Sequence, residues 1–490
     1  MFKKPTKKQF LIRRIILSSI ATLAVIIIAT VAILFMLGYR LDSNNGRLEQ
    51  GALLQFDSAP SGADVYVDGH SIGTRTATKQ TVIAGTHSIK MTKSGYQDWN
   101  RTLNLAAGTL TWLDYSLLVP KDRPVQTVTN YKTLVGLSIS SDGKWALAQE
   151  KADLPSFHVV DLRSEDVKST VISVPNASYS EPTVEGVTHS FNMVSWDSGS
   201  RYVLVKHLYR DLTEWIVVDT QNPNATINIS QLLGVSFKDV QFAGTSGKVL
   251  YGLTSDGAIR KVDLSAATLS RAFVTHVDSF SIYDNTILSY IGVDAADSTK
   301  RVAGVYRDGD EAPHILRSTS STDLVLKIAT SRYFSDDFVA IAEGNMVTIL
   351  KGSYPGSSNQ DNTSLSKFAS LELSGAVSAL SFSPKGDYVV AQSGETFKSY
   401  EIEHTRADVG TIPVTDGKAA STLKWLDVAH LWNDDNNTLT IRDFNGINTF
   451  SIMKVEPGYS AGLSQNGRFF YAVGKTDKGY HLQRVKMILE

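Results

Sequence analysis

The sequence predicts an all-β protein carried on one N-terminal apolar helix. Near the N-terminus, residues 15–38 form a run of 24 residues without a charge. Short alternating apolar runs with glycine-rich turns between them follow over residues 51–119, which is the pattern of half-buried strands. From residue 121 to 490 a strand-turn-strand unit recurs at intervals of about 46 residues, the signature of a repeat architecture. The predicted order is therefore a helix, a small β-domain and a large β-repeat domain.

The length and composition set the domain count and exclude several kinds of site. A chain of 490 residues is too long for one core, because single cores stop growing near about 250–300 residues. The chain has no cysteine, which excludes disulfides, thiolate metal sites and cysteine nucleophiles. The 35 glycines against 13 prolines favour many tight turns over disorder. We therefore expect at least two folded domains.

Basic charge is concentrated at the N-terminus. Residues 1–14 contain six of the 48 lysines and arginines and no acidic residue. These six are Lys3, Lys4, Lys7, Lys8, Arg13 and Arg14. The rest of the chain holds all 49 acidic residues and is mildly acidic. Because phosphate binding needs clustered lysine and arginine on the binding face, we expect no nucleic-acid partner.

The uncharged run 15–38 predicts a helix that crosses a membrane. At about 1.5 Å per residue this helix is about 36 Å long, enough to cross a hydrocarbon core of about 30 Å with some tilt. A cleaved signal peptide is the alternative, but its apolar region is typically about 7–15 residues long and ends in small residues. This run ends in Phe35-Met36-Leu37-Gly38, so we interpret it as an uncleaved signal anchor.

The distribution of charge around this helix predicts its orientation. Cations gather on the cytoplasmic side of membrane helices, which places the basic tail 1–14 in the cytoplasm. The domains after residue 38 are then extracytoplasmic, and the protein is a single-pass protein of the cell membrane.

A small β-domain is predicted at 51–119, after a polar linker at 39–50. Residues 63–67 alternate between apolar and polar, which places alanine and two valines on one face of a strand. The Asp68-Gly69 pair that follows is typical of a two-residue hairpin turn. Further strands are expected at 87–91, 102–105 and 110–118.

Five motifs in this region recur in one known family. They are, in order, Pro60-Ser61-Gly62-Ala63, Val65-Tyr66-Val67-Asp68-Gly69, Ile72-Gly73, Ala84-Gly85-Thr86-His87 and Lys93-Ser94-Gly95-Tyr96. On these motifs the region resembles a PEGA domain. The resemblance implies a surface-exposed β-sandwich of bacterial and archaeal envelope proteins that acts as a spacer or binding accessory and not as an enzyme. Ser61 stands where the family usually has glutamate and Ala77 where it commonly has proline, so no role of that glutamate carries over.

The remainder of the chain, 121–490, is built from repeats. The clearest copies of the unit begin at Leu137, Leu380 and Leu463. Weaker copies begin near Val194, Val240, Phe280, Tyr333 and Leu423. Each has a small-residue strand, a turn and an apolar strand, and the spacing of about 46 residues fits four-stranded blades.

We therefore predict a β-propeller of about eight blades, with seven as the alternative. The clearest copies are similar to the WD40-like repeats of TolB-type propellers. A closed ring hides strand edges that would otherwise pair with other chains. To close it, we expect the terminal strands near residues 125–131 and 480–487 to share one blade.

The sequence shows no motif of a common catalytic site. It has no His-Glu-x-x-His, no Gly-x-Ser-x-Gly and no glycine-rich loop ending in Gly-Lys-Ser/Thr. The oxygen-rich stretch 433–437 has the ligand type that calcium prefers, but it lies between two apolar runs, so we interpret it and 308–311 as turns. His87 is interpreted as structural. We predict no catalytic, metal-binding or cofactor-binding residue and no cofactor.

Tryptophans are the other candidate ligand contacts, because indole rings can stack on sugars or bind peptides. Those considered are Trp99, Trp112, Trp196, Trp215, Trp425 and Trp432. In blades such residues mostly pack between sheets, so a core position is favoured for each.

These features favour a non-catalytic protein of the cell envelope, anchored in the membrane by one helix. In this hypothesis the PEGA-like module is a stalk that presents the propeller, which binds another protein or a cell-wall polymer. The alternative is an exported hydrolase with an unrecognised active site. Propeller peptidases carry an additional α/β domain, and no stretch here has its helix-strand alternation. A sensor that signals inward is disfavoured because the tail of 14 residues leaves no room for a cytoplasmic domain.

The anchor makes a testable prediction about topology. Protease added to intact cells or spheroplasts should digest the bulk of the chain, because everything after residue 38 is expected outside the membrane. Immunoblotting against a C-terminal tag follows the digestion. Protection of the propeller until the membrane is broken would reverse the topology, and a soluble mature form that begins near Tyr39 would show a cleaved signal sequence.

Overall fold

The computed structural model describes most of the chain and divides it into two units. The described residues are 7–36, 38–41, 48–181, 187–320, 324–356, 365–415 and 417–489. The units are Met1–Lys121 and Asp122–Glu490, and each has its own buried apolar side chains. Residues 1–6 of the basic tail and 42–47 of the expected linker lie outside the described residues.

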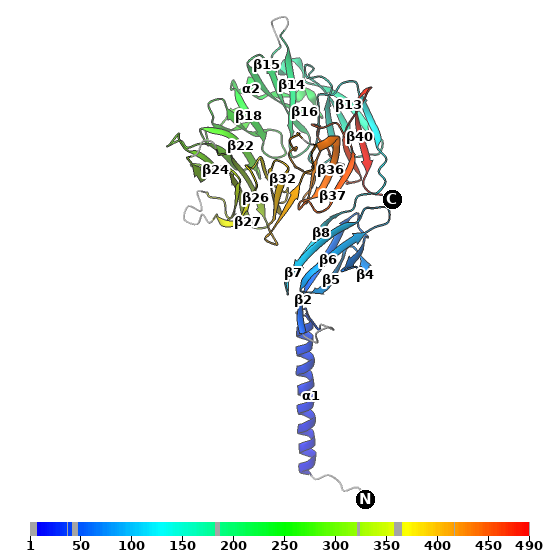
Figure 1. Cartoon of the computed structure of the whole chain (residues 1–490). Helices are drawn as coiled ribbons and strands as arrows, with labels where there is room; N and C mark the ends of the chain where they lie inside the picture. Colours follow the sequence, from blue (N-terminus) through cyan, green and yellow to red (C-terminus); the bar gives the residue numbers. More distant parts are fainter. Residues whose placement is uncertain are drawn as a thin grey trace. The chain divides into compact units, whose positions relative to one another are not determined.

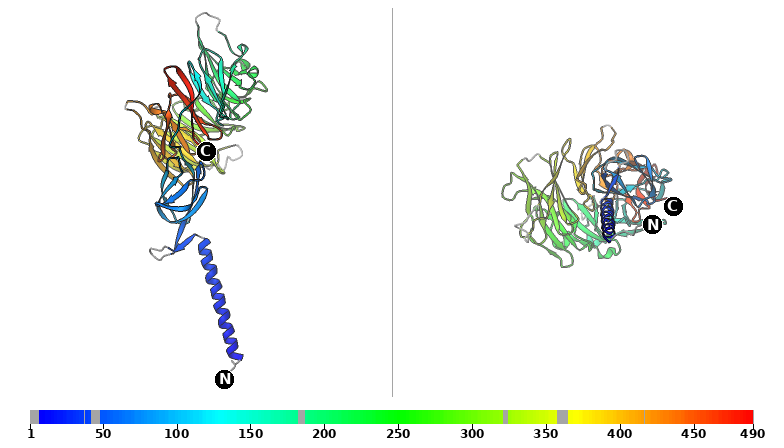
Figure 2. Two further views of the ribbon diagram at one scale, coloured as in Figure 1. Left: turned by 90° about the vertical axis from the view of Figure 1, so that its right-hand side faces the viewer. Right: turned by 90° about the horizontal axis from the view of Figure 1, so that it is seen from below.

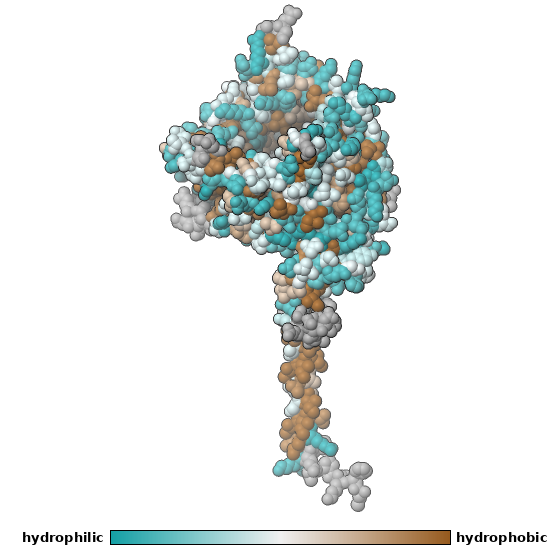
Figure 3. Space-filling view, viewed as in Figure 1, coloured by the Kyte–Doolittle hydropathy of each residue, from teal (hydrophilic) through white to brown (hydrophobic). Residues whose placement is uncertain are grey.

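The N-terminal helix α1, Lys7–Met36, contains most of the predicted span (Figure 1). Its segment Leu11–Met36 has a mean hydropathy of 2.7 and none of it is buried, and Figure 3 shows apolar side chains along its length. The hydroxyls of Thr22 and Thr30 donate to carbonyl oxygens four residues earlier, at 2.9 and 2.8 Å, so these polar groups are satisfied within the helix. A helix of this kind is what either a membrane anchor or a signal sequence requires.

The β-domain of the first unit consists of two four-stranded sheets. One has the order β4-β3-β6-β7, and in the other β1, β5 and β8 all pair with β2. The strands are β1 Tyr39–Leu41, β2 Leu48–Ala59, β3 Asp64–Val67, β4 His70–Arg75, β5 Thr78–Ile83, β6 Gly85–Thr92, β7 Trp99–Leu105 and β8 Leu110–Leu117. Apolar side chains of both sheets are buried, and Trp99 of β7 meets Tyr115 of β8 edge to face at 5.6 Å. This is a β-sandwich, as the sequence predicts.

The Asp68-Gly69 pair forms the predicted hairpin turn between β3 and β4. Asp68 has φ 50° and Gly69 has φ 79°, the left-handed values that a two-residue turn requires. The Asp68 carboxylate accepts the Ser88 N–H at 2.9 Å and lies 2.6 Å from His87 Nδ1. His87 Nε2 lies 2.7 Å from the Ile83 carbonyl oxygen, so both ring nitrogens of this histidine are used inside the domain.

Thr76 holds the Pro60-Ser61-Gly62-Ala63 turn in place. Its hydroxyl accepts the Gly62 N–H at 3.0 Å and the Ala63 N–H at 2.9 Å. The same oxygen lies 2.7 Å from Ser58 Oγ, and Thr76 is 7% exposed. These bonds use the backbone of the turn and not the side chain of residue 61. Serine in place of the family's glutamate therefore leaves the turn intact.

Within its described residues, the second unit contains eight four-stranded sheets. The first four are β10 Gly136–Ile139, β11 Trp145–Gln149, β12 Ser156–Asp161 and β13 Lys168–Ser173; β14 His189–Trp196, β15 Tyr202–Tyr209, β16 Leu212–Asp219 and β17 Ile227–Asn228; β18 Phe237–Phe242, β19 Val249–Thr254, β20 Ile259–Asp263 and β21 Thr268–Leu269; β22 Val277–Tyr283, β23 Ile287–Val293, β24 Arg301–Arg307 and β25 His314–Thr319. The last four are β26 Leu326–Tyr333, β27 Asp336–Glu343, β28 Met346–Gly352 and β29 Ser366–Glu372; β30 Ala379–Phe382, β31 Tyr388–Ser393, β32 Thr396–Glu401 and β33 Arg406–Thr411; β34 Lys424–Trp425, β35 His430–Asn433, β36 Thr438–Asp443 and β37 Thr449–Lys454; β38 Gly462–Leu463, β39 Phe469–Thr476, β40 Gly479–Lys486 and β9 Gln126–Tyr131. A short helix, α2 Ile229–Leu233, lies between β17 and β18.

The sheets follow one another around a ring, which Figure 1 shows and Figure 2 presents from two further sides. Buried apolar clusters join each sheet to the next from the first sheet to the seventh. The seventh and eighth sheets are joined by backbone bonds, such as that from the Glu456 N–H to the Val473 carbonyl oxygen at 2.8 Å. Eight such sheets make a propeller of eight blades. This is the larger of the two predicted numbers.

The recurring serine-containing turns connect the first and second strands of the blades. In blade 1, Ser140 Oγ accepts the Trp145 N–H at 3.0 Å and donates to Asp142 at 2.8 Å. In blade 8, Ser464 Oγ accepts the Phe469 N–H at 3.1 Å. Such local bonds from side chain to backbone stabilise turns. The repeat visible in the sequence is therefore a repeated turn closed by its own side chains.

The two ends of the second unit close the ring. Strand β9 pairs with β40, with Tyr131 opposite Tyr480 and Thr129 opposite Leu482. The first and last blades also share one buried cluster, which includes Tyr131, Ala146 and Leu482. The predicted sharing of one blade by the terminal strands is confirmed. The eighth blade obtains its fourth strand from the start of the unit.

The Asp68-Gly69 turn yields a stability prediction for the sandwich. Gly69→Val should lower its free energy of unfolding by roughly 1–3 kcal/mol, because a β-branched residue is strained at positive φ. A Cβ at this position meets no atom within 4 Å, so the loss comes from backbone strain and not from a clash. Thermal unfolding of the full chain in detergent measures it. Gly69→Asn is the matched control, since asparagine tolerates this conformation, and equal midpoints for the two variants would show that the turn is misassigned.

Candidate functional site

A pocket opens where the first, seventh and eighth blades meet. It has a volume of about 460 Å³. Its walls come from the turns between the first and second strands of these blades, at 139–143 in blade 1, 424–427 in blade 7 and 460–465 in blade 8. We call it the turn-face pocket. Because blades from both ends of the unit line it, the pocket requires a closed ring.

The blade 1 and blade 8 walls are joined through their backbones. The Gln465 N–H donates to the Gly143 carbonyl oxygen at 3.1 Å, and the Ile139 N–H donates to Ser460 Oγ at 3.4 Å. Gly143 has φ 66°, and a Cβ on it would lie 2.3 Å from the Leu463 carbonyl oxygen. Only glycine allows so close an approach at this φ. The main chain therefore fixes this side of the pocket.

Blade 7 supplies an aromatic wall. Trp425 is half-buried, and its Nε1 donates to Ser381 Oγ of blade 6 at 3.0 Å. Trp432 is 4% exposed, and Lys424 Nζ lies 4.6 Å from the centroid of its ring, a cation–π contact. This wall presents an indole ring and an ammonium group to the pocket.

Two carboxylates line the pocket, and both are paired with other groups of the protein. Asp142 accepts the Ser140 hydroxyl at 2.8 Å and lies 2.9 Å from Lys144 Nζ. Burial raises the pKa of Asp142, but the hydrogen bonds from Lys144 and Ser140 outweigh it, so the pKa lies below its usual value. Asp142 is therefore ionised and already paired.

Asp427 is paired with a buried histidine. Its carboxylate accepts the Ala429 N–H at 2.9 Å and the His430 N–H at 2.8 Å, and it contacts His430 Nδ1 at 2.8 Å. Burial raises the pKa of Asp427, but the charge and hydrogen bonds of His430 lower it further, so it lies below the usual value. His430 is 5% exposed, and its Nε2 is 3.5 Å from Asp443 Oδ1. The imidazole therefore lies between two carboxylates.

The oxygen-rich stretch 433–437 is used for bonds within the propeller. Asp435 accepts both the N–H and the hydroxyl of Ser421 at 2.9 Å. Asp434 accepts the Gly458 N–H at 2.7 Å. These carboxylates tie neighbouring loops together. Within the part of the chain that the structure describes, no group of three or more histidine, aspartate and glutamate side chains is arranged to hold a metal ion.

The second acidic stretch, 308–311, also forms a turn. The Asp310 N–H donates to the Arg307 carbonyl oxygen at 3.0 Å. The Asp308 carboxylate pairs with Lys261 Nζ. This stretch therefore links blade 4 to blade 3 and lies outside the turn-face pocket.

The six tryptophans considered as ligand contacts divide between core and surface. Trp99, Trp215 and Trp432 are buried, Trp196 and Trp425 are half-buried, and Trp112 is 38% exposed. A core position is thus correct for three of the six and wrong for Trp112. Trp425 and Trp432 are the two that line the turn-face pocket.

The sequence-based search missed a buried polar cluster in blade 2. His207 is fully buried, with Nδ1 2.8 Å from Glu214 and Nε2 3.3 Å from His189 Nδ1. Glu214 also accepts Ser180 Oγ and Gln231 Nε2, both at 2.9 Å. Burial lowers the pKa of His207 in spite of the carboxylate beside it. The sequence does hold a signal for this cluster. His207 and Glu214 are equally far from the hairpin turn between β15 and β16, so the two residues lie opposite each other in the paired strands.

Comparison with known families agrees with the predicted small β-domain. Residues 52–119 match the PEGA domain family. No curated protein matches the chain in sequence. Among solved structures, the β-propeller domain of Myceliophteria thermophila Cps50 (Swd1) is 10% identical with a TM-score of 0.40, covering 75% of this chain and 100% of that one. An oligogalacturonate lyase in complex with manganese is 10% identical with a TM-score of 0.42, covering 74% of this chain and 99% of that one.

The Asp427–His430 pair yields a prediction of pH-dependent stability. Asp427→Asn should destabilise the propeller near neutral pH by about 1 kcal/mol or less, because the carboxylate is partly exposed. A carboxyl whose pKa is lowered on folding stabilises the native state at pH values above its unfolded pKa, about 3.9. This stabilisation is lost as the pH falls through the pKa of the native state. The difference in melting midpoint between wild type and variant should therefore vanish in strong acid. Asp477→Asn, at an exposed position, is the control, and a difference for Asp427→Asn that stays constant with pH would contradict the pairing.

Proposed function

We propose that this chain, a PEGA domain followed by an eight-bladed β-propeller, is a membrane-anchored protein of the cell envelope that binds a protein or a cell-wall polymer and does not catalyse a reaction. In this proposal α1 is an uncleaved anchor with its basic tail in the cytoplasm, and both domains are extracytoplasmic. Along the chain, the PEGA domain lies between the anchor and the propeller. The propeller binds its partner at the turn-face pocket.

The turn-face pocket is the observation that carries the proposal. Its volume of about 460 Å³ falls within the range of ligand sites, about 300–1,000 Å³. Its lining combines the Trp425 ring with the exposed polar side chains of Lys424, Ser141 and Gln465. An apolar ring beside a few polar groups suits a unit of a polymer or a side chain that protrudes from another protein.

The state of the pocket's ionisable groups supports binding over catalysis. General acid–base catalysis needs a group whose pKa lies near the working pH. Asp142 and Asp427 both have pKa values below the usual range for aspartate, and both accept hydrogen bonds from the chain. His430 is buried and paired with Asp427. Each of these groups is thus engaged in holding the turns.

Length and charge support an anchor over a cleaved signal sequence. The uncharged run 15–38 has 24 residues, longer than the roughly 7–15 residues of a signal peptide's apolar region. The basic residues of the tail precede it, which favours an N-terminus in the cytoplasm. Both observations fit a protein that stays in the membrane with its domains outside.

Crosslinking in intact cells tests the proposal. The full chain is crosslinked, purified through a C-terminal tag, and its partners are compared between variants. Lys424→Glu reverses the charge at the rim of the turn-face pocket and should lower capture about tenfold, a loss of about 1.4 kcal/mol in binding free energy. Lys248→Glu, at an exposed position before β19 in blade 3, is the matched control and should capture normally.

Two outcomes would contradict the proposal. Equal capture by wild type and Lys424→Glu would remove the turn-face pocket from the binding site. Conversion of a captured polymer into shorter products by the purified chain would favour the alternative, an exported hydrolase.

A further inference from the structure

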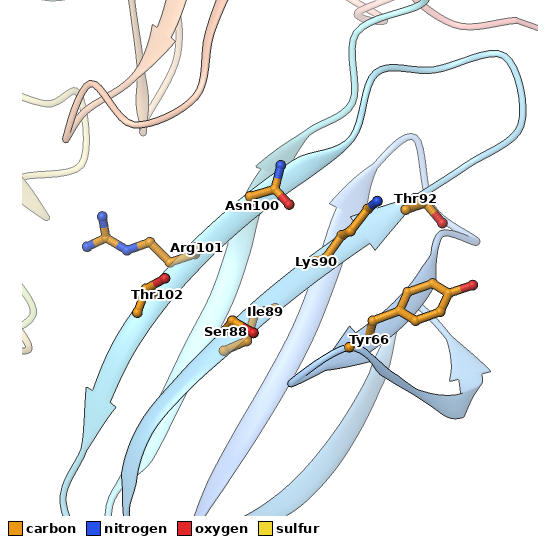
Figure 4. Close-up of a pocket in the computed structure, with 9 residues that line it drawn as sticks. Tyr66, Ser88, Ile89, Lys90, Thr92, Asn100, Arg101 and Thr102 are labelled. Atoms are coloured by element: carbon orange, nitrogen blue, oxygen red, sulfur yellow. The ribbon is translucent and has the colours of Figure 1, made fainter.

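A second pocket lies on the PEGA domain, over the outer face of the sheet β4-β3-β6-β7. It has a volume of about 590 Å³. Five of its lining side chains project from three neighbouring strands, Tyr66 from β3, Ser88 and Lys90 from β6, and Asn100 and Thr102 from β7 (Figure 4). Tyr66 is half-buried and the other four are exposed. We call it the sheet-face pocket.

The strand register arranges these side chains in two rows. Tyr66 is opposite Lys90 and Lys90 is opposite Asn100, while Ser88 is opposite Thr102. Side chains paired in this way have Cβ atoms about 4.5–5.5 Å apart on one face of the sheet. The rows therefore form a continuous polar surface across three strands, with one aromatic ring at its edge.

The groups of this surface are mainly neutral and can both donate and accept hydrogen bonds. Hydroxyls and amides have this double capacity, and Ser88, Asn100, Thr102 and Tyr66 supply them. The Ser88 hydroxyl donates to Asp68 Oδ1 at 3.5 Å, and its oxygen can still accept a hydrogen bond. Among the described residues, no partner holds the hydroxyls of Tyr66 and Thr102, so they remain available to a ligand.

The cations at the pocket do not favour an anionic ligand. Lys90 Nζ lies 2.7 Å from the Asp98 carboxylate, so its charge is already balanced. The side chain of Arg101, which also contributes to the lining, points away from Tyr66 and Lys90 in Figure 4. Recognition of a polyanion depends on cations that are free to neutralise it.

The sheet's own pairing also disfavours a peptide. An added peptide strand binds beside the backbone of an edge strand. The pocket lies over the face of the sheet and not beside the edge at β7, and the backbones of β3 and β6 pair with strands on both sides. A protein surface would need several aromatic or arginine anchors in a desolvated centre. Among the described residues, the lining holds one aromatic side chain, Tyr66, and one arginine, Arg101, which is only 3% exposed.

We propose that the sheet-face pocket binds a neutral oligosaccharide. The Tyr66 ring packs against the apolar face of a sugar ring, and Ser88, Asn100 and Thr102 hydrogen-bond sugar hydroxyls. The volume falls within the range of small-ligand sites, about 300–1,000 Å³. This site gives the PEGA domain a ligand of its own, separate from the turn-face pocket and beyond a role as spacer.

Titration of the full chain with sugar probes tests the proposal. The chain is kept in a detergent without a sugar head group and titrated by calorimetry with short chito-, cello- and malto-oligosaccharides, and with alginate oligosaccharides as acidic probes. At least one neutral probe should bind. Tyr66→Ala should weaken that binding about tenfold or more and Tyr66→Phe less than about threefold, because phenylalanine keeps the ring.

Controls make each outcome decisive. Thermal unfolding shows whether Tyr66→Ala keeps the sandwich folded, and Thr102→Val, a change that suits an exposed strand, should also weaken binding if the first variant unfolds. Lys248→Glu, which lies in neither pocket, should bind the neutral probe as the wild type does. Binding of acidic probes alone, no binding of any neutral probe, unchanged binding by both PEGA variants, or loss of binding in Lys248→Glu would each overturn the proposal.

Discussion

The pairing of β9 with β40 is the interaction on which the propeller depends. A blade has two faces that pack against neighbouring sheets, and every inner blade has a neighbour in sequence on both sides. The first and last blades have such a neighbour on one side only. Their other faces pack together because the ends of the unit meet, through the pairing of Thr129 with Leu482 and one buried cluster that both blades share. The entropic cost of such a long-range contact rises only with the logarithm of the loop length. Within the first seven blades, each strand pairs with its neighbours in sequence.

The same closure creates the turn-face pocket. Its blade 1 and blade 8 walls meet through the bond from Gln465 to Gly143, and blade 7 adds Trp425 and the paired Asp427. Binding by the propeller is thus linked to ring closure, because an open ring would separate these walls. The sheet-face pocket is different, since it depends only on register among three strands of the sandwich. One chain therefore carries two surfaces whose integrity depends on separate contacts.

The sequence predicts those features of the fold that interactions between nearby residues determine. The hairpin at Asp68-Gly69 and the serine turns of the blades are visible because side chains a few residues away close them, as Ser140 does for Trp145. Strand β2 was not predicted, although Ala52, Leu54 and Phe56 alternate with less buried residues, and its place depends on pairing with β5 and β8. The turn-face pocket was not predicted either. Gly143 and Trp425 are far apart in sequence, and only the closed ring brings them to one pocket.

A designed disulfide across the closing pair tests the closed ring most directly. The chain has no cysteine, so Asn130→Cys with His481→Cys introduces the only two thiols, at positions that lie opposite each other in β9 and β40. Paired Cβ atoms at about 4.5–5.5 Å are close enough to bridge with small adjustment. Thiol labelling of the folded double variant under oxidising conditions should find both thiols consumed, while each single variant stays reactive. Two reactive thiols in the folded double variant would contradict the closed ring and, with it, the turn-face pocket.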